Sequence, residues 1–431
     1  YLQELSQEDL KSGLYKENHL GDLLGKTGIE AEYESVLRGI NGKVLEVVDS
    51  MGRKREEIER KNPLHGQNIW LTLDFDIQRE AEKLLEGKEG AAVVLDAKTG
   101  EVLALACYPT FDPNKFINRF SPEEWLSLVN NPDFPLENRA VRGLYSPGSL
   151  FKLTMALAAL DSNTISEKTA FYCNGTVQIY GHPFSCWFRA GHGSMDLSNG
   201  IKNSCNIYFY NLGRRIGIDQ IVKYASLLGF GRKTGIDLPG EKDGLVPSPE
   251  WKKRTRNLSW YPGETISVSI GQGPLLVTPL QVALHTALIA NRGVRGVPHL
   301  VKSDLGSAQK SENGNSQDEI PTIQIKRTAF EKVIEGMWHS VNDGGTGRAA
   351  RIDGFDICGK TGSTQLVSAE TAEKLSKERK ETKTHSWFTG FAPRDNPQVV
   401  VTFLVEFGGM GGQTAAPLAR KIFDLYRKKY D

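Results

Sequence analysis

Two short apolar runs joined by a turn constrain the fold more than any other feature of this sequence. Residues 91–96 and 101–106 are dominated by apolar side chains, and the turn between them contains Lys98-Thr99-Gly100. This pattern predicts a β-hairpin. Residues 386–392 and 399–407 are two further strand-like stretches near the end of the chain. We therefore expect a mixed α/β domain, in which an antiparallel sheet joins strands from both ends of the domain and is flanked by helices.

The sequence between these strands predicts several helices. Residues 74–86, with Asp76 as the expected N-cap, carry apolar side chains at helical spacing, namely Ile77, Ala81, Leu84 and Leu85. Residues 279–291 are apolar enough to form a buried helix. Further helical patterns lie at residues 149–159, 199–217 and 416–428.

Other stretches have no helical pattern. Residues 69–73 alternate like a strand, and residues 109–138 are rich in Pro and Asn, which indicates a long surface loop. Residues 306–321 are polar and read as a surface insertion. Residues 1–65 are dense in charge and short of apolar runs, so we expect a small peripheral module there and the main domain over residues 66–431.

Composition excludes several classes of protein. The 53 basic and 52 acidic side chains give a net charge of +1. This balance lacks the excess of positive charge that is typical of nucleic-acid-binding proteins, and it excludes a disordered acidic or basic tail protein. The mean hydropathy is −0.37, and no window approaches 18 uninterrupted apolar residues, so we expect no transmembrane helix within these residues. The sequence begins at Tyr1 without an initiator Met or a signal-like segment, which indicates a trimmed N-terminus.

A serine and a lysine three residues apart are the first candidates for chemistry. The sequence YSPGSLFK ends at Lys152, so a Pro-Gly turn precedes a helix whose first turn carries Ser149 and Lys152 on one face. The amine can take the hydroxyl proton if burial and neighbouring charge lower its pKa. The helix N-terminus also favours negative charge developing at an attacked carbonyl. Taken alone, this pattern is more often a serine N-cap beside a solvated lysine.

Two further motifs follow in order. Ser204-Cys205-Asn206 lies near the middle of the helical stretch 199–217, and Lys360-Thr361-Gly362-Ser363-Thr364 follows the apolar run 355–358. Lys-Thr-Gly alone says little, because it occurs four times, beginning at Lys26, Lys98, Lys233 and Lys360. Only the last copy follows a strand-like run and precedes another strand. The ordered set S-x-x-K, S-x-N and K-T-G is the one found in β-lactamases and penicillin-binding proteins.

With these motifs, the chain resembles a class B penicillin-binding protein over nearly all of its length, and most closely the elongation-specific penicillin-binding protein 2 subgroup. Residues 25–42, 74–78, 263–278 and 385–393 are also similar to family segments. The resemblance implies a penicillin-binding, serine-transpeptidase-like domain over residues 66–431. It also implies that residues 1–65 are the membrane-proximal pedestal, which in the family follows an N-terminal membrane helix.

The resemblance implies a role for each motif residue. Ser149 is the implied nucleophile that becomes acylated, and Lys152 is its general base. Ser204 would relay a proton to the leaving D-alanine, and Asn206 would hold the substrate amide. Lys360 would set the electrostatic field around Ser204 and the substrate carboxylate.

The rest of the third motif is implied to bind substrate along one strand, through Thr361, Gly362, Ser363 and Thr364. The hydroxyls of Thr361 and Ser363 would bind the peptide. The oxyanion hole would be the backbone N–H groups of Ser149 and Ser363. Many relatives carry Thr in place of Ser363, but the hydroxyl is retained.

The five cysteines are too few for a disulfide scaffold, yet three of them cluster with a histidine. Cys173, Cys186, His192 and Cys205 are the donor types of a structural tetrahedral zinc site, although their spacing lacks a tight C-x₂₋₄-C knuckle. A Cys173–Cys186 disulfide and ordinary buried thiols are the alternatives. The resemblance supports the metal, because the subgroup has a metal site beside the second motif whose Cys and His match Cys205 and His192. Cys107 lies in an apolar strand, as does Cys358, and we expect both in the core.

The implied activity is a D,D-transpeptidase that cross-links peptidoglycan stem peptides from a lipid-linked precursor and is acylated by β-lactam antibiotics. Within the family, the elongation class works with a membrane glycosyltransferase of the SEDS type. The catalytic domain would be periplasmic and anchored to the cytoplasmic membrane. The alternatives are a β-lactamase, for which we find no Glu-x-x-Leu-Asn run between the second and third motifs, and a β-lactam sensor, which the pedestal-like residues 1–65 argue against. A non-catalytic scaffold would need a broken motif, and none is broken.

Overall fold

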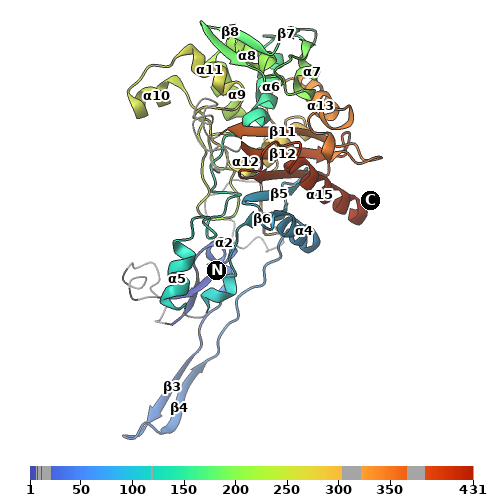
Figure 1. Cartoon of the computed structure of the whole chain (residues 1–431). Coiled ribbons are helices and arrows are strands. Elements are labelled where there is room, and N and C mark those ends of the chain that lie inside the picture. Colours follow the sequence, from blue (N-terminus) through green and yellow to red (C-terminus); the bar gives the residue numbers. More distant parts are fainter. Residues whose placement is uncertain are drawn as a thin grey trace.

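The computed structural model of this protein describes residues 1–5, 7, 11, 21–117, 120–302, 322–365 and 384–430. Figure 1 shows a broad upper body built around one sheet and a narrow lower part that ends in a long hairpin. The polar insertion expected at residues 306–321 lies outside the described residues. No helix in the described ranges is long and apolar enough to cross a membrane.

The central sheet has five strands in the order β11-β12-β13-β5-β6, and each neighbouring pair is antiparallel. The N-terminal pair and the C-terminal strands of the domain therefore meet in one sheet, as the sequence predicts. The strands are β5 (Gly90–Asp96), β6 (Val102–Tyr108), β11 (Cys358–Gln365), β12 (Thr384–Ala392) and β13 (Val399–Val405).

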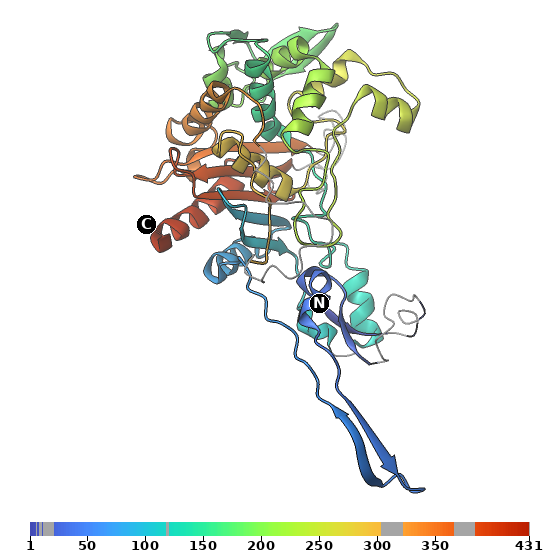
Figure 2. The same ribbon diagram turned by 180° about the vertical axis from the view of Figure 1, so that it is seen from behind.

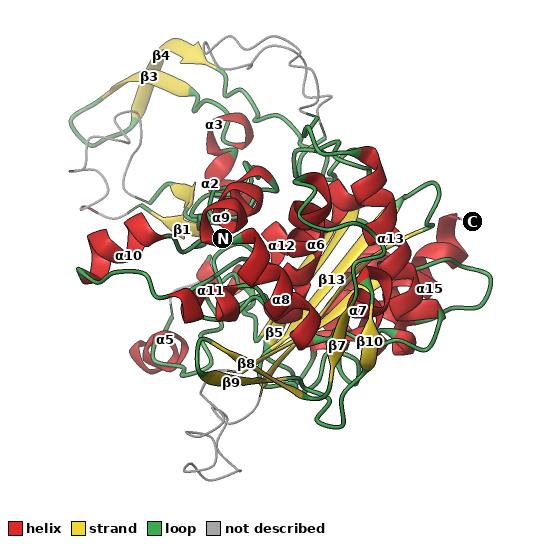
Figure 3. Ribbon diagram, turned by 90° about the horizontal axis from the view of Figure 1, so that it is seen from above, coloured by secondary structure: helices red, strands yellow, loops and turns green. Residues whose placement is uncertain are grey.

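Both faces of the sheet are covered by helices. Successive residues of β5 belong to different cores: Val93 packs with the cluster that contains α6 (Lys152–Asp161), α12 (Pro279–Ala290) and α13 (Arg327–Asn342). Val94 packs with α4 (Phe75–Leu85) and α15 (Ala415–Tyr430) on the opposite face. This alternation follows from the two-residue period of a strand. The view from above shows helices on both sides of the central strands (Figure 3).

Three helices that the sequence predicts, α4, α12 and α15, are present in the structure. Every residue of α12 is buried, in keeping with its lack of a polar face. In α4 the buried residues are those expected from the spacing, Ile77, Ala81, Leu84 and Leu85. The N-cap of α4 differs from the prediction, because the carboxylate of Asp74, not Asp76, accepts hydrogen bonds from the first turn. Helix α15 covers the closing segment expected at residues 416–428.

Three other expectations are corrected. Residues 69–73 form no sheet strand and make only an isolated bridge between Leu71 and Val301. The supposed loop at residues 109–138 contains η1 (Pro113–Phe116) and the helix α5 (Pro122–Val129), which begins with a capping box. The stretch 199–217 is two helices, α7 (Leu197–Lys202) and α8 (Asn206–Ile216).

Shorter elements surround this body. They are η2 (Gly148–Phe151), β7 (Phe171–Cys173), β8 (Thr176–Ile179), β9 (His182–Ser185), β10 (Gly193–Met195), α9 (Ile218–Leu227), α10 (Pro249–Arg256), α11 (Pro262–Val268) and η4 (Arg348–Ala350). Strands β7 and β10 pair with each other, as do β8 and β9. These two ribbons lie at the end of the body opposite to the long hairpin (Figure 1).

The N-terminal part forms a separate small unit with its own short elements. They are β1 (Leu2–Glu4), β2 (Leu23–Gly25), α2 (Gly28–Glu32), α3 (Glu34–Leu37), β3 (Lys43–Val48) and β4 (Lys54–Lys61). Every residue of strands β3 and β4 is exposed, and the hairpin that they form projects away from the body in both side views (Figures 1 and 2). The unit contacts the rest of the chain through the Tyr33 hydroxyl, which donates to Asp237 Oδ2 at 2.8 Å, and through Tyr1, which stacks on Phe116.

Candidate active site

The first motif forms a tight turn that leads into α6. Ser149 lies in η2 and is half-buried, and Lys152 is fully buried at the first position of α6. Gly148 has a φ of +54°, and a Cβ at this position would lie 2.6 Å from the hydroxyl oxygen of Thr364. Only glycine meets both conditions without strain. The turn that presents Ser149 therefore lies directly against β11.

Ser146, which the sequence did not single out, fixes this turn. Its carbonyl oxygen accepts hydrogen bonds from Thr364 Oγ1 at 3.0 Å and from Trp387 Nε1 at 3.2 Å. Its own hydroxyl donates to the carbonyl of Gly271 at 3.0 Å. The backbone N–H of Gly148 donates to the same carbonyl at 3.0 Å. Strands β11 and β12 and the loop after α11 thus hold the turn from two sides.

Lys152 brings the first and second motifs together. Its Nζ donates to the carbonyl oxygen of Ser204 at 2.8 Å, to Ser204 Oγ at 3.2 Å and to Asn206 Oδ1 at 2.7 Å. Two of these acceptors belong to Ser204, between α7 and α8, and the third belongs to Asn206, the first residue of α8. The serine hydroxyl, the amide and the amine are therefore in one hydrogen-bonded group.

The second motif does not lie in the middle of one helix, as the sequence suggested. Ser204 has a φ of +53°, in the left-handed region, and Cys205 is the N-cap of α8 with an extended backbone. A non-glycine residue in this region is held there by its surroundings, and such residues cluster at functional sites. The break between α7 and α8 turns Ser204 and Asn206 toward Lys152.

Burial changes the electrostatics of both motif lysines. Desolvation lowers the pKa of Lys152 to about 8, although the neighbouring Cys205 and Cys186 oppose that shift. The pKa of Lys360 is held well below its usual range, first by complete burial and then by the charge of Lys152. Both amines can therefore lose a proton at much lower pH than a lysine in water.

The third motif lies on β11, an edge strand of the sheet that pairs with β12. An edge strand leaves alternate N–H and C=O groups free on its outer side. Gly362 faces the turn of the first motif, because a Cβ there would lie 3.0 Å from the carbonyl oxygen of Pro147. Lys360 Nζ donates to the carbonyl of Thr361 at 2.9 Å. The backbone N–H of Gly411 donates to the hydroxyl of Ser363 at 3.0 Å.

The other copies of Lys-Thr-Gly lie elsewhere in the fold. The copy that begins at Lys26 leads into α2, and the one at Lys98 is in the turn between β5 and β6. The copy at Lys233 is in a loop where the Thr234 backbone N–H donates to Glu241 Oε1 at 2.7 Å. The copy at Lys360 lies in strand β11, in keeping with the strand-like pattern around it, and β11 lies against the turn of the first motif.

A buried ion pair supports the segment before the turn. Arg139 Nε lies 2.7 Å from Glu406 Oε1, and the two side chains are 5% and 13% exposed. The hydroxyl of Tyr145 donates to the same carboxylate oxygen at 2.7 Å. No pattern in one sequence links Glu406 to residues so far away along the chain, so this group was not predicted.

The predicted cysteine and histidine cluster forms in space. Potential ligand atoms of Cys173, Cys186, His192 and Cys205 all lie within 4.8 Å of one another, and the three thiols are buried. His192 Nδ1 is 3.6 Å from the sulfur of Cys173 and 3.5 Å from that of Cys186. All five cysteines are free. Contact with the Cys205 thiol lowers the pKa of Cys186, which favours one thiolate in the cluster.

The two remaining cysteines are core residues, as expected. Cys358 is fully buried at the start of β11, and Cys107 is partly buried in β6. Burial raises the pKa of the Cys107 thiol to about 11, so it stays protonated at neutral pH.

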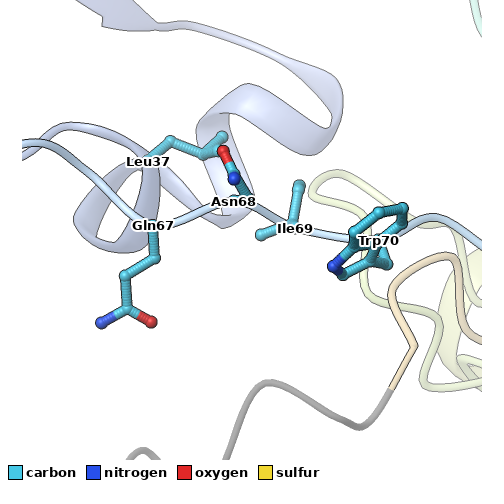
Figure 4. A pocket seen from close by; sticks show the side chains of 5 residues that line it. All are labelled: Leu37, Gln67, Asn68, Ile69 and Trp70. Atoms are coloured by element: carbon cyan, nitrogen blue, oxygen red, sulfur yellow. The ribbon is translucent and has the colours of Figure 1, made fainter.

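A pocket of about 360 Å³ lies far along the chain from these motifs. Leu37 of α3 lines it with the extended segment 67–70, and Trp70 stands at one end (Figure 4). Trp70 is 71% exposed. None of the motif residues lines this pocket, so it is separate from the candidate active site.

The chain matches two family models and a curated relative. Residues 90–424 match a family model described as the penicillin binding protein transpeptidase domain, and residues 1–71 match one described as the penicillin-binding protein dimerisation domain. The chain is 39% identical over 437 residues to the peptidoglycan D,D-transpeptidase MrdA of Acinetobacter baumannii, an alignment that covers 100% of this chain and 64% of that relative. The chain therefore spans a little under two thirds of the relative's length.

Two solved structures have the same fold. The complex between penicillin-binding protein PBP2 and MreC from Helicobacter pylori superposes with a TM-score of 0.86 at 32% identity, covering 100% of this chain and 77% of that one. A structure titled "Structural coordination of polymerization and crosslinking by a peptidoglycan synthase complex" gives a TM-score of 0.85 at 32% identity, covering 99% of this chain and 73% of that one.

Proposed function

Because the chain belongs to the penicillin-binding protein transpeptidase family, we propose that it is a serine-type D,D-transpeptidase that cross-links peptidoglycan stem peptides during cell-wall elongation. The observation that carries this proposal is the buried amine of Lys152, which lies three residues from Ser149 and bonds to Ser204 and Asn206. A lysine with a lowered pKa beside a serine is the arrangement that nucleophilic catalysis at a carbonyl needs.

The hydrogen bonds of Lys152 explain why its protonation state matters. As an ammonium group, the amine has three protons, and these match its three acceptors. Loss of one proton leaves a lone pair that can accept a proton from a serine hydroxyl. A pKa of about 8 makes this neutral form accessible near neutral pH.

The reaction follows in two steps. Ser149 Oγ attacks the carbonyl between the last two D-alanines of a stem peptide, and its proton passes to Lys152. The backbone N–H groups of Ser149 and Ser363 stabilise the oxyanion. As the intermediate collapses, Ser204 relays the proton to the departing D-alanine. The amine of a second stem peptide then attacks the acyl-enzyme carbonyl. The new C–N bond replaces the ester bond to Ser149 Oγ, and the proton that the amine loses passes through Lys152 to that oxygen, which restores the serine hydroxyl.

The remaining motif residues bind and orient the donor peptide. Asn206 holds the substrate amide. A bound carboxylate favours the ammonium form of Lys360, and the positive charge of that ammonium group then stabilises the carboxylate. Thr361 and Ser363 bind the peptide through their hydroxyls. Thr364 and Gly362 keep β11 close to the turn that carries Ser149, because they contact the turn and Gly362 has no side chain to displace it.

We also propose that Cys173, Cys186, His192 and Cys205 hold a structural zinc ion. Three sulfur donors and one imidazole, gathered in a mostly buried cluster, suit zinc and leave no position for a catalytic water. The ion would brace the break before α8, because Cys205 separates Ser204 from Asn206. Metal analysis of protein purified without chelator should find about one zinc per chain. A Cys173–Cys186 disulfide in metal-free, fully active protein would instead establish the redox alternative.

Partners and location are proposed on the same basis. The relative from H. pylori forms a complex with MreC, and we propose an elongation partner of this kind and a SEDS-type glycosyltransferase for this chain. We place the catalytic domain in the periplasm, residues 1–65 next to the cytoplasmic membrane and residues 66–431 above them. The substrate is a lipid-linked precursor, and no nucleic acid takes part.

One kinetic experiment separates this proposal from its two alternatives. The protein is acylated with a β-lactam and freed of excess reagent, and its deacylation is followed by mass spectrometry. It is then supplied with nascent peptidoglycan and a polymerase. We expect a long-lived acyl-enzyme and cross-linked dimers from untreated protein. Rapid hydrolysis of the adduct would favour a β-lactamase, and a stable adduct without any cross-linking would favour a sensor.

A further inference from the structure

Two aromatic side chains next to the second motif are exposed, although neither has a role in the proposed reaction. Trp187 is 46% exposed and Phe188 is 43% exposed, and they directly follow the buried Cys186 after the end of β9. Their ring centroids lie 5.8 Å apart. The ring of His192 lies 5.4 Å from that of Trp187 and 5.1 Å from that of Phe188. Trp187 and Phe188 thus present one aromatic surface, packed with His192, which we call the aromatic platform.

Hydrogen bonds hold the platform beside the second motif. Trp187 Nε1 donates to the carbonyl oxygen of Asn203 at 3.0 Å, and Asn203 directly precedes Ser204. Two residues before Trp187, the carbonyl oxygen of Ser185 accepts from Asn206 Nδ2 at 3.4 Å. The platform is therefore attached to the chain on both sides of the motif. A surface that is already ordered loses little conformational freedom when it binds a partner, which favours binding.

The reaction itself determines which partner arrives at this position. Transpeptidation breaks one C–N bond and forms another at the same carbonyl carbon, so the incoming amine takes the place that D-alanine leaves. In the proposed mechanism that place is beside Ser204, which relays the proton to the departing amine. The strand that bears the incoming amine therefore approaches over the surface around Ser204. The platform is part of this surface, because Trp187 is bonded to Asn203.

The chemistry of the platform suits the sugar rings of that strand. The face of an aromatic ring carries partial negative charge, which attracts the partly positive C–H groups on the apolar face of a pyranose. The exposed Arg189, next along the chain, adds positive charge that complements the carboxylates of a stem peptide. Strand β9 lies at the end of the body opposite to the long hairpin (Figure 1). Under the proposed location, the platform is thus on the side of the body away from the membrane.

We propose that Trp187 and Phe188 bind a sugar ring of the peptidoglycan strand that supplies the acceptor amine. This inference deepens the proposed function and rests on it. The donor peptide binds along β11 and the acceptor strand binds at the platform, so the two substrates contact different parts of the fold. Loss of the platform then impairs transfer to a sugar-bearing acceptor and leaves acylation of Ser149 intact.

The test measures the two half-reactions separately. Acylation is followed with a fluorescent penicillin, and transfer is followed with a peptide thioester as donor and one of two acceptors. One acceptor is a disaccharide-peptide with a free side-chain amine, and the other is a small D-amino acid without sugars. In Trp187→Leu we expect the efficiency of transfer to the disaccharide-peptide to fall about 10-fold, the scale of removing an aromatic anchor from an interface. Acylation and transfer to the D-amino acid should change less than about 2-fold.

Two further variants control for effects on the fold. Trp70→Leu removes another exposed tryptophan, which is 71% exposed in the separate pocket, and should leave transfer to both acceptors unchanged. Trp187→Phe keeps an aromatic face and should recover most of the transfer to the disaccharide-peptide. Zinc content is measured in every variant, because Trp187 is next to Cys186. If Trp187→Leu does not fold or loses zinc, Phe188→Leu gives the same comparison.

The outcomes separate this inference from the proposed function. Equal losses with both acceptors, no loss with either, or no recovery in Trp187→Phe would overturn the assignment of the platform. A wild-type protein that is acylated by neither the penicillin nor the thioester would instead refute the proposed function itself.

Discussion

The protonation of Lys152 leads to a quantitative prediction for acylation. Only the neutral amine can accept the proton of Ser149, and burial lowers the pKa of Lys152 to about 8. The neutral fraction is then about 9% at pH 7, 50% at pH 8 and 91% at pH 9. Because the neutral form is the base, the acylation rate constant should rise with pH, about 10-fold between pH 7 and pH 9, with a midpoint near pH 8.

The assay is the second-order rate constant for acylation by a fluorescent penicillin, measured in steps of half a pH unit. Lys152→Ala should lower that constant by about 10²–10⁴-fold and remove the rise, since positioned proton transfer contributes a factor of this size. Lys253→Ala is the matched control, because Lys253 is exposed on α10 and should keep the wild-type profile. A profile without a midpoint near pH 8 would refute the reasoning. The same midpoint in Lys152→Ala would transfer the role of base to another group, such as Lys360.

Three further predictions follow from the structure. Gly148→Ala should lower the melting temperature and the acylation rate, because its Cβ would lie 2.6 Å from Thr364 Oγ1 at a φ of +54°, with strain of about 1–3 kcal/mol; unchanged values would contradict this reading of the turn. Cys205→Ala should lower both zinc content and melting temperature, because a ligand assembled by folding couples metal binding to stability; wild-type zinc content would remove Cys205 from the site. Glu406→Gln should lower the free energy of unfolding, measured with urea, by about 3 kcal/mol, because Arg139 keeps a buried charge without its counterion. A decrease below about 1 kcal/mol would show that the other hydrogen-bond partners of Arg139 are enough to stabilise its charge.

Much of the fold follows from local pattern. The hairpin at residues 91–106 and the two C-terminal strands were predicted from apolar runs, and their union in one sheet from the order of elements. The buried helix α12 was predicted because it has no polar face. These features depend on which side chains are buried, and buried positions appear in the sequence as a pattern of apolar residues.

The errors came from features that depend on distant contacts or on backbone conformation. Residues 69–73 alternate like a strand, yet they form no strand of the sheet. Their β-pairing is a single isolated bridge between Leu71 and Val301, and the Thr72 hydroxyl donates to the carbonyl of Val102 in β6. The left-handed backbone of Ser204 has no sequence signal, because serine rarely adopts it. The start of α5, by contrast, could have been predicted, because a serine at position 121 followed three residues later by Glu124 is the pattern of a capping box.

The candidate site was predicted more completely than its surroundings. The ordered motifs identified Lys152, Ser204 and Asn206, and the structure brings them into contact. Ser146 was missed because it acts through its carbonyl oxygen, whose hydrogen bonds to Thr364 and Trp387 are visible only in the structure. The chemical roles of the motif residues stay predictions until they are measured.

Intact-mass spectrometry with peptide mapping after exposure to a penicillin tests the central claim most directly. The claim is that Ser149 is the nucleophile, and it predicts one adduct per chain, located on the peptide that contains Ser149 and absent from a folded Ser149→Ala variant. An adduct on any other residue, or undiminished labelling of Ser149→Ala, would contradict it.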